Sequence, residues 1–173
     1  VCYGYDIIMS NSEVHDLNSP GGRSASKYPY SISSSVYGGK VSKNKGYNFS
    51  TSGSTGVCYG IYLSTSSTAL DVYNNMIGNL NSTAYSSTTA PYLSIAGIYV
   101  SAGTVNLYNN TVFIPASSTS SGTNASAAAV YASTSATLLM QNNLLVNRSV
   151  PKGLGKSIAY GRSSTTLTSY ASA

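Results

Sequence analysis

The sequence predicts an all-β protein, a parallel β-helix or β-solenoid, from its composition, its internal repeat and the shortness of its strands. Only 8% of the 173 residues are charged, whereas 42% are apolar and 16 are Tyr. Ser, Thr, Asn, Tyr and Val are abundant, which suits strands and tight turns rather than disorder. The expected strands are only about 4–6 residues long, and the sequence lacks the Asn-Gly and Asp-Gly dipeptides that close hairpins.

The repeat is a segment built around adjacent polar residues, most often two asparagines. It is clearest at 71–77, 106–112 and 139–145, with fainter copies at 8–14 and 40–46. One aligned column is small and polar, and its members are Ser12, Asn44, Asn75, Asn110 and Asn143. The differences between these positions give repeat lengths of 32, 31, 35 and 33 residues, a period typical of solenoids.

Two further columns of the repeat are apolar. One comprises Met9, Val41, Val72, Leu107 and Met140. The other comprises Val14, Gly46, Ile77, Val112 and Leu145. Stacking each strand on its equivalent one coil later brings these columns into register about 4.8 Å apart. The apolar columns then fill the interior, and the polar column predicts an inward ladder of side-chain amides.

A second landmark precedes the asparagine segment in most coils. It is an apolar pair followed by tyrosine, with the tyrosines at Tyr62, Tyr99, Tyr131 and Tyr160. We predict that these rings stack as a ladder that supports the coil. Each coil therefore reads as strand, polar bend, strand, asparagine turn, strand and variable loop.

These landmarks predict one solenoid domain over 1–173, with five to six coils of about 29–37 residues. The expected coils lie near 1–27, 28–56, 57–93, 94–126, 127–157 and, in part, 158–173. Neither end resembles a cap. We therefore expect a fragment of a longer repeat protein, or a subunit that self-associates by stacking its coils end to end.

The phrases Gly97-Ile98-Tyr99, Leu107 to Val112 and Gln141 to Asn147 carry a family resemblance. The pattern resembles the right-handed parallel β-helix repeats of the pectate-lyase-like superfamily. It is most similar to the repetitive surface and secreted proteins of Bacteroidetes and their relatives. The resemblance implies a right-handed solenoid, and the few charges and many Ser, Thr and Asn residues suggest an extracellular or cell-surface location. It does not specify an activity, because the superfamily holds lyases, hydrolases, adhesins and tail spikes.

Carboxylates are the groups with which enzymes of this superfamily work, as calcium ligands or as acid and base. This chain has four acidic residues, which are Asp6, Glu13, Asp16 and Asp71. Glu13, His15 and Asp16 are the weak catalytic candidates. In a strand, residues 13 and 15 share a face, and we expect Asp16 to point away. We predict no cofactor and no metal site, and a polar outer surface is the alternative reading of this cluster.

Cys2 and Cys58 both occur in the sequence Val-Cys-Tyr-Gly. This match predicts similar positions on coils two apart, hence separated by about 9–10 Å. A disulfide requires Cα atoms within about 7 Å. We therefore expect two unpaired, mostly buried thiols.

Tyr73 and Tyr108 each lie one residue from an inward column, so we expect them to face outward and offer a surface to a glycan or a partner. The net charge of +5 comes from scattered basic residues, which does not indicate nucleic-acid binding. No apolar run has the length of a membrane span. The sequence favours a non-enzymatic stalk, filament or adhesin segment of a bacterial surface or secreted protein. The alternative is a carbohydrate-active or glycan-binding module whose catalytic coils lie elsewhere.

Overall fold

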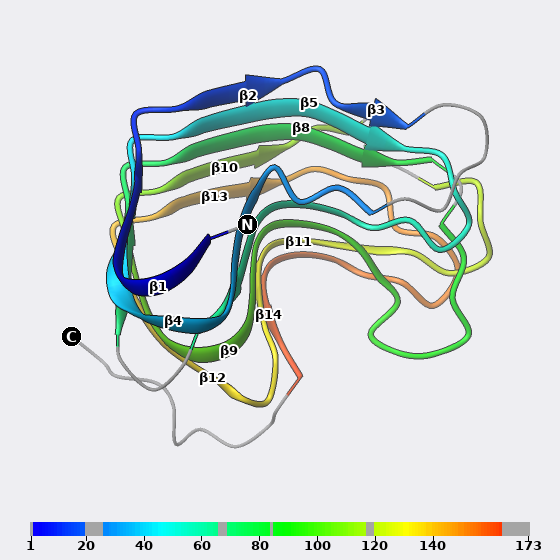
Figure 1. Ribbon diagram of the computed structural model, residues 1–173. Helices are drawn as coiled ribbons and strands as arrows, with labels where there is room; N and C mark the ends of the chain where they lie inside the picture. Colours follow the sequence, from blue (N-terminus) through cyan, green and yellow to red (C-terminus); the bar gives the residue numbers. More distant parts are fainter. Residues whose placement is uncertain (1, 20–25, 66–68, 84, 117–119, 164–173) are drawn as a thin grey trace.

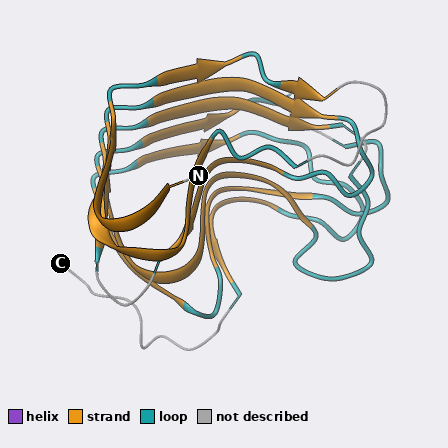
Figure 2. Ribbon diagram, viewed as in Figure 1, coloured by secondary structure: helices purple, strands orange, loops and turns teal. Residues whose placement is uncertain are grey.

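The computed structural model describes residues 2–19, 26–65, 69–83, 85–116 and 120–163, with the backbone alone for 2–5 and 33–36 (Figure 1). The described residues form strands and loops without a helix (Figure 2). All ladders between the named strands are parallel, and they stack into a β-solenoid of about 4 turns. The predicted fold class is confirmed, while five to six coils is slightly too many. Counting landmarks overstates the turns because the outermost landmarks belong to incomplete coils.

The strands form two sheets. The eight-stranded sheet contains β1 (Cys2–Ser10), β4 (Tyr30–Ser42), β6 (Cys58–Ser64), β9 (Leu93–Tyr108), β11 (Ser126–Ala132) and β14 (Ser157–Arg162), with β7 (Leu70–Tyr73) beside β4 and β9 and β12 (Ala136–Gln141) beside β9. The six-stranded sheet contains β2 (Glu13–His15), β5 (Lys45–Thr51), β8 (Met76–Ser82), β10 (Thr111–Ile114) and β13 (Leu144–Asn147), with β3 (Asn18–Ser19) beside β5.

Two long strands turn a corner of the solenoid without a break. β4 has 13 residues and β9 has 16, and each pairs with two shorter strands of a neighbouring coil, as β4 does with β6 and β7 (Figure 1). The predicted polar bend is therefore hydrogen-bonded strand in these coils. Gly39 makes the turn possible, because its φ is +116° and a Cβ there would lie 2.2 Å from the carbonyl oxygen of Ile7.

Columns of aligned side chains fill the interior of the coil. The register confirms both predicted apolar columns, from Met9 to Met140 and from Val14 to Leu145. A third column comprises Tyr30, Ile61, Ile98, Val130 and Tyr160, and a fourth comprises Ile32, Leu63, Val100 and Ala132. Burial of these aliphatic groups is the main source of stability in the fold.

Glycines adjust the interior where two faces approach each other. A Cβ on Gly97 would lie 2.2 Å from Val112 Cγ1. At Gly46 the missing side chain is replaced by the Tyr30 ring, whose Cε2 would lie 3.0 Å from a Cβ at that position. The buried Tyr30 hydroxyl donates to the carbonyl oxygens of Ser12 and Lys45, so its polar end is satisfied.

The predicted inward ladder is present along one corner. Asn44 Nδ2 donates to Asn75 Oδ1 (3.1 Å), Asn75 Nδ2 donates to Asn110 Oδ1 (2.9 Å), and Asn110 Nδ2 donates to Asn143 Oδ1 (3.0 Å). Ser12 Oγ begins the ladder by donating to Asn44 Oδ1 (2.6 Å). The residue before each member has a positive φ, at Asn11, Lys43, Asn74, Asn109 and Asn142. In each pair of asparagines, the first therefore makes the left-handed turn and the second forms the ladder.

One tyrosine of the second landmark is out of register. Tyr62, Tyr99 and Tyr131 are aligned, but Tyr131 pairs with Gly161, and Tyr160 pairs with Val130 and packs against the interior core. The predicted membership of Tyr160 in the tyrosine ladder is wrong. Tyr160 occupies the interior position that Ile61, Ile98 and Val130 hold in the preceding coils, so the sequence match of the tyrosines is shifted by one residue in this coil.

The two cysteines do not occupy similar positions. Cys2 pairs with Ile32, which aligns with Leu63, whereas Cys58 pairs with Ile95. In the coil that contains Cys58, the residue aligned with Cys2 is therefore Leu63, five positions later. The two copies of Val-Cys-Tyr-Gly do not occupy equivalent positions in their coils. Cys58 is a buried free thiol, as expected, and burial raises its pKa to about 12. The side chain of Cys2 lies outside the described part.

Candidate functional sites on the outer surface

The structure brings the weak catalytic candidates together at an exposed edge. Glu13 Oε1 accepts from the Tyr47 hydroxyl (2.7 Å) and from Lys45 Nζ (3.2 Å), both on the next coil. These two hydrogen bonds lower the pKa of Glu13. The His15 ring stacks on Tyr47 with 5.2 Å between centroids and 11° between planes. The cluster therefore links neighbouring coils.

Asp16 does not point away from this cluster as predicted. Its φ is +57°, which ends β2 and breaks the alternation of the strand. Asp16 Oδ2 lies 2.7 Å from His15 Nδ1, and Asp16 Oδ1 accepts from Asn48 Nδ2 (2.9 Å). The hydrogen bond from His15 is the first cause, and that from Asn48 the second, of the lowered pKa of Asp16. The face assignment from strand periodicity fails because residue 16 is left-handed.

Tyr73 and Tyr108 are directly paired on neighbouring strands, β7 and β9, and both are half-buried. They line a pocket of about 520 Å³ together with Lys40, Asp71 and Gln141. Asp71 Oδ1 accepts a hydrogen bond from Asn106 Nδ2 (2.9 Å). The pocket therefore combines two aromatic rings with polar side chains of both charges, an arrangement suited to a sugar.

A second hydrophobic core lies on the outside of β6, β9 and β11. The Tyr99 ring stacks on Tyr59 (4.8 Å), Tyr62 (5.6 Å) and Tyr131 (6.0 Å). Tyr59 is buried and its pKa is raised by desolvation, with smaller contributions from the neighbouring tyrosines. Sequence reasoning missed Tyr59. The available signal was the pair of alanines aligned with it, Ala96 and Ala128, which leave room for large neighbours.

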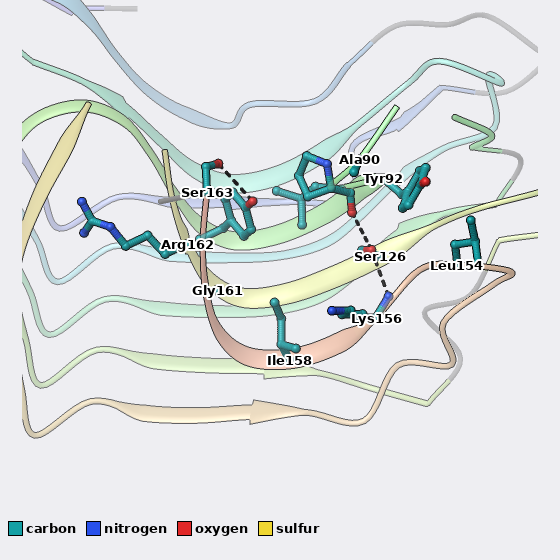
Figure 3. A pocket seen from close by; sticks show the side chains of 12 residues that line it. Ala90, Tyr92, Ser126, Leu154, Lys156, Ile158, Gly161, Arg162 and Ser163 are labelled. Atoms are coloured by element: carbon teal, nitrogen blue, oxygen red, sulfur yellow. Dashed lines mark hydrogen bonds between the residues drawn. The ribbon is translucent and has the colours of Figure 1, made fainter. Parts of the chain in front are cut away.

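A pocket of about 610 Å³ adjoins this outer core, between residues 90–93 and the turn at 154–156 (Figure 3). Ser126 joins its two sides, because its Oγ donates to the carbonyl oxygen of Pro91 (2.7 Å) and accepts from the backbone N of Lys156 (3.0 Å). Arg162 also borders the pocket, but its guanidinium points away and donates to the carbonyl oxygen of Ala136.

The surface defines a class of protein by its architecture: a parallel β-solenoid whose polar side chains mainly connect coils. Comparison with known proteins gives no match to a family model, to a curated protein or to a solved structure. Within the described ranges, three or more His, Cys, Asp or Glu side chains do not gather into a group able to hold a metal ion. The same ranges contain no helix of the length and apolarity needed to cross a membrane.

Proposed function

We propose that this chain is a non-enzymatic structural or adhesive segment of a bacterial cell-surface or secreted protein. The observation that supports the proposal is the use of its carboxylates. Glu13 accepts from Tyr47 and Lys45, and Asp16 accepts from Asn48. Asp71 in turn accepts from Asn106. The donors in these bonds lie 32 to 35 residues from the acceptors, so each of these three acids connects neighbouring coils.

The same proposal includes the superfamily to which the chain is related. A corner ladder of asparagines, aligned interior columns and variable loops on one side are the features that support membership of the right-handed β-helix repeats of the pectate-lyase-like superfamily. A stalk or filament element needs uniform coil-to-coil contacts, which these features provide. The outer strands β13 and β14 each pair with one neighbour among the described strands, which supports self-association by stacking.

Incubation with a panel of acidic and neutral polysaccharides tests the non-enzymatic role. We expect no release of reducing ends or of unsaturated uronates. Release of either, abolished by Glu13→Gln, would replace the structural proposal with a lyase or hydrolase. Sedimentation velocity over a range of concentrations tests the stacking, for which we expect species larger than one chain.

Glycan binding at Tyr73 and Tyr108 is a second candidate function. It is favoured by the direct pairing of the two tyrosines in a pocket that Lys40 and Asp71 also line. A glycan array with the Tyr73→Ala, Tyr108→Ala double variant tests it. We expect the parent chain to bind glycans on the array and the double variant to lose this binding. Equal signals from both proteins would exclude this pocket.

A further inference from the structure

The outer face of the six-stranded sheet carries an aromatic column with one position missing. His15, Tyr47, Gly78 and Phe113 are aligned in consecutive coils on β2, β5, β8 and β10 (Figure 1). The first two rings stack at 5.2 Å, so this column holds rings face to face at the spacing of the coils. Gly78 interrupts the column between Tyr47 and Phe113.

The space above Gly78 is open. A Cβ there would have one heavy atom within 4 Å, the carbonyl oxygen of Phe113 at 3.5 Å. Tyr47, Phe113, Met76 and Asn79 line a cavity of about 500 Å³ around it. Two coil steps separate the ring layers by about 9–10 Å, so an inserted ring would lie about 4.8 Å from each. That separation falls within the range over which rings stack favourably.

The wall on the Tyr47 side is held in place before any ligand arrives. Its hydroxyl donates to Glu13, and its ring stacks on His15, both on the preceding coil. Phe113 lies on β10 between β8 and β13, and it is 42% exposed. A gap with one wall already held in place reduces the entropy that binding must overcome.

The rim of the gap carries an amide on one side of Gly78 and, on the other, a methionine flanked by Lys45 and Thr111 of the neighbouring coils. Asn79 Nδ2 donates to Asn48 Oδ1 (2.6 Å), and Asn48 Nδ2 donates to Asp16 Oδ1 in the same direction. Asn79 Oδ1 is therefore the last acceptor of this outer ladder, and in the described part of the chain it receives no donor. On the opposite side of Gly78 lies Met76, which is 53% exposed.

We propose that the gap at Gly78 binds one hexopyranose ring of a glycan between Tyr47 and Phe113. A chair-form pyranose has apolar C–H faces for the two rings and a hydroxyl edge that donates to Asn79 Oδ1. A phenyl ring would fit the same spacing, as His15 does on Tyr47, but it has no hydroxyl to donate to Asn79 Oδ1, so the amide at the rim favours the sugar. This site goes beyond the structural role, and it lies on a different sheet from the Tyr73–Tyr108 pocket.

Fluorine labelling tests the proposal, because the chain has 2 Phe and Phe49 is buried in the interior. With 4-fluorophenylalanine incorporated, tetrasaccharides of β-1,4-linked glucose, mannose and N-acetylglucosamine are titrated, with p-cresol as the aromatic probe. We expect at least one saccharide to shift the Phe113 resonance in a saturable way and to leave the Phe49 resonance unchanged. Binding to p-cresol alone, or no shift with any of the saccharides, overturns the proposal.

Three variants sharpen the test. Gly78→Leu fills the gap, and the backbone tolerates the change because Gly78 does not have a positive φ. Gly78→Leu and Phe113→Ala should each weaken saccharide binding at least tenfold, measured by calorimetry. Leu144→Ala, an exposed residue on β13 of the same sheet, is the matched control and should bind as the parent does. Unchanged affinity in Gly78→Leu, with a circular dichroism spectrum and urea midpoint like those of the parent, contradicts the proposal. Either result leaves the structural role intact, because that role rests on the coil-to-coil links.

Discussion

The molecule contains two amide ladders with nearly the same hydrogen bond and very different surroundings. The inner ladder runs through Asn44, Asn75 and Asn110, which are at most 2% exposed. The outer ladder runs through Asp16, Asn48 and Asn79, with Nδ2–Oδ1 distances of 2.9 Å and 2.6 Å. Water can replace the outer bonds but cannot reach the inner ones. Burial, rather than bond geometry, therefore decides how much each ladder matters to stability.

The largest effect is expected from Asn75→Ala. This change removes the acceptor of Asn44 N and Nδ2 and the donor to the carbonyl oxygen of Val41 and to Asn110 Oδ1. Several buried groups lose partners at once, so we expect a loss of about 3–5 kcal/mol in the free energy of unfolding. Urea denaturation followed by circular dichroism measures it. A loss below about 1 kcal/mol would show that water replaces the side chain inside the coil.

A smaller loss is expected from Gly97→Ala, where the new Cβ would lie 2.2 Å from Val112 Cγ1. Overpacking of this kind costs about 1–3 kcal/mol. Gly78→Ala is the matched control, since its Cβ enters open space, and should change stability by less than about 0.5 kcal/mol. The double variant Gly97→Ala, Val112→Ala should recover only part of this loss, because the new Cβ would still lie 2.6 Å from the carbonyl oxygen of Ala129 and the shortened Val112 leaves a cavity.

The outer tyrosine core predicts a loss of stability in alkali. Burial raises the pKa of Tyr59 above its value in the unfolded chain, so the folded state holds its proton longer. This contribution is complete below about pH 10, the unfolded pKa, and decreases as the pH rises beyond it. Urea midpoints measured between neutral pH and pH 11 should fall less steeply in Tyr59→Phe than in the parent. Identical slopes would mean that Tyr59 ionises freely in the folded state.

Apart from the Gly78→Ala control, the smallest effect is expected from Asn48→Gly in the outer ladder. The φ of Asn48 is +60°, which glycine adopts without strain. The lost hydrogen bonds are exposed, so stability should change by less than about 1 kcal/mol. The ratio between this loss and that of Asn75→Ala measures the effect of burial. Equal losses would contradict the comparison between the ladders.

The interior columns and the inner ladder could largely be predicted from the sequence, whereas the sites on the outer surface could not. Inner columns recur because each interior position accepts a narrow range of side chains, as with Met9 to Met140 and the Ser12 to Asn143 ladder. Outer positions tolerate many residues, so the alignment of His15, Tyr47 and Phe113 across Gly78 leaves no recurring pattern. Asp16 was misplaced for the related reason that a left-handed residue is not visible in strand periodicity.

The sequence by itself determined the solenoid, its period and its inner ladder. These features repeat, because equivalent buried positions accept only a narrow range of residue types in every coil. Only the tertiary structure decided which side chains meet on the outside: the Tyr59–Tyr99 stack, the shift of Tyr160 to the interior, the separate columns of Cys2 and Cys58, and the gap at Gly78. Their partners lie about thirty residues away, and a register shift of one residue exchanges inside for outside.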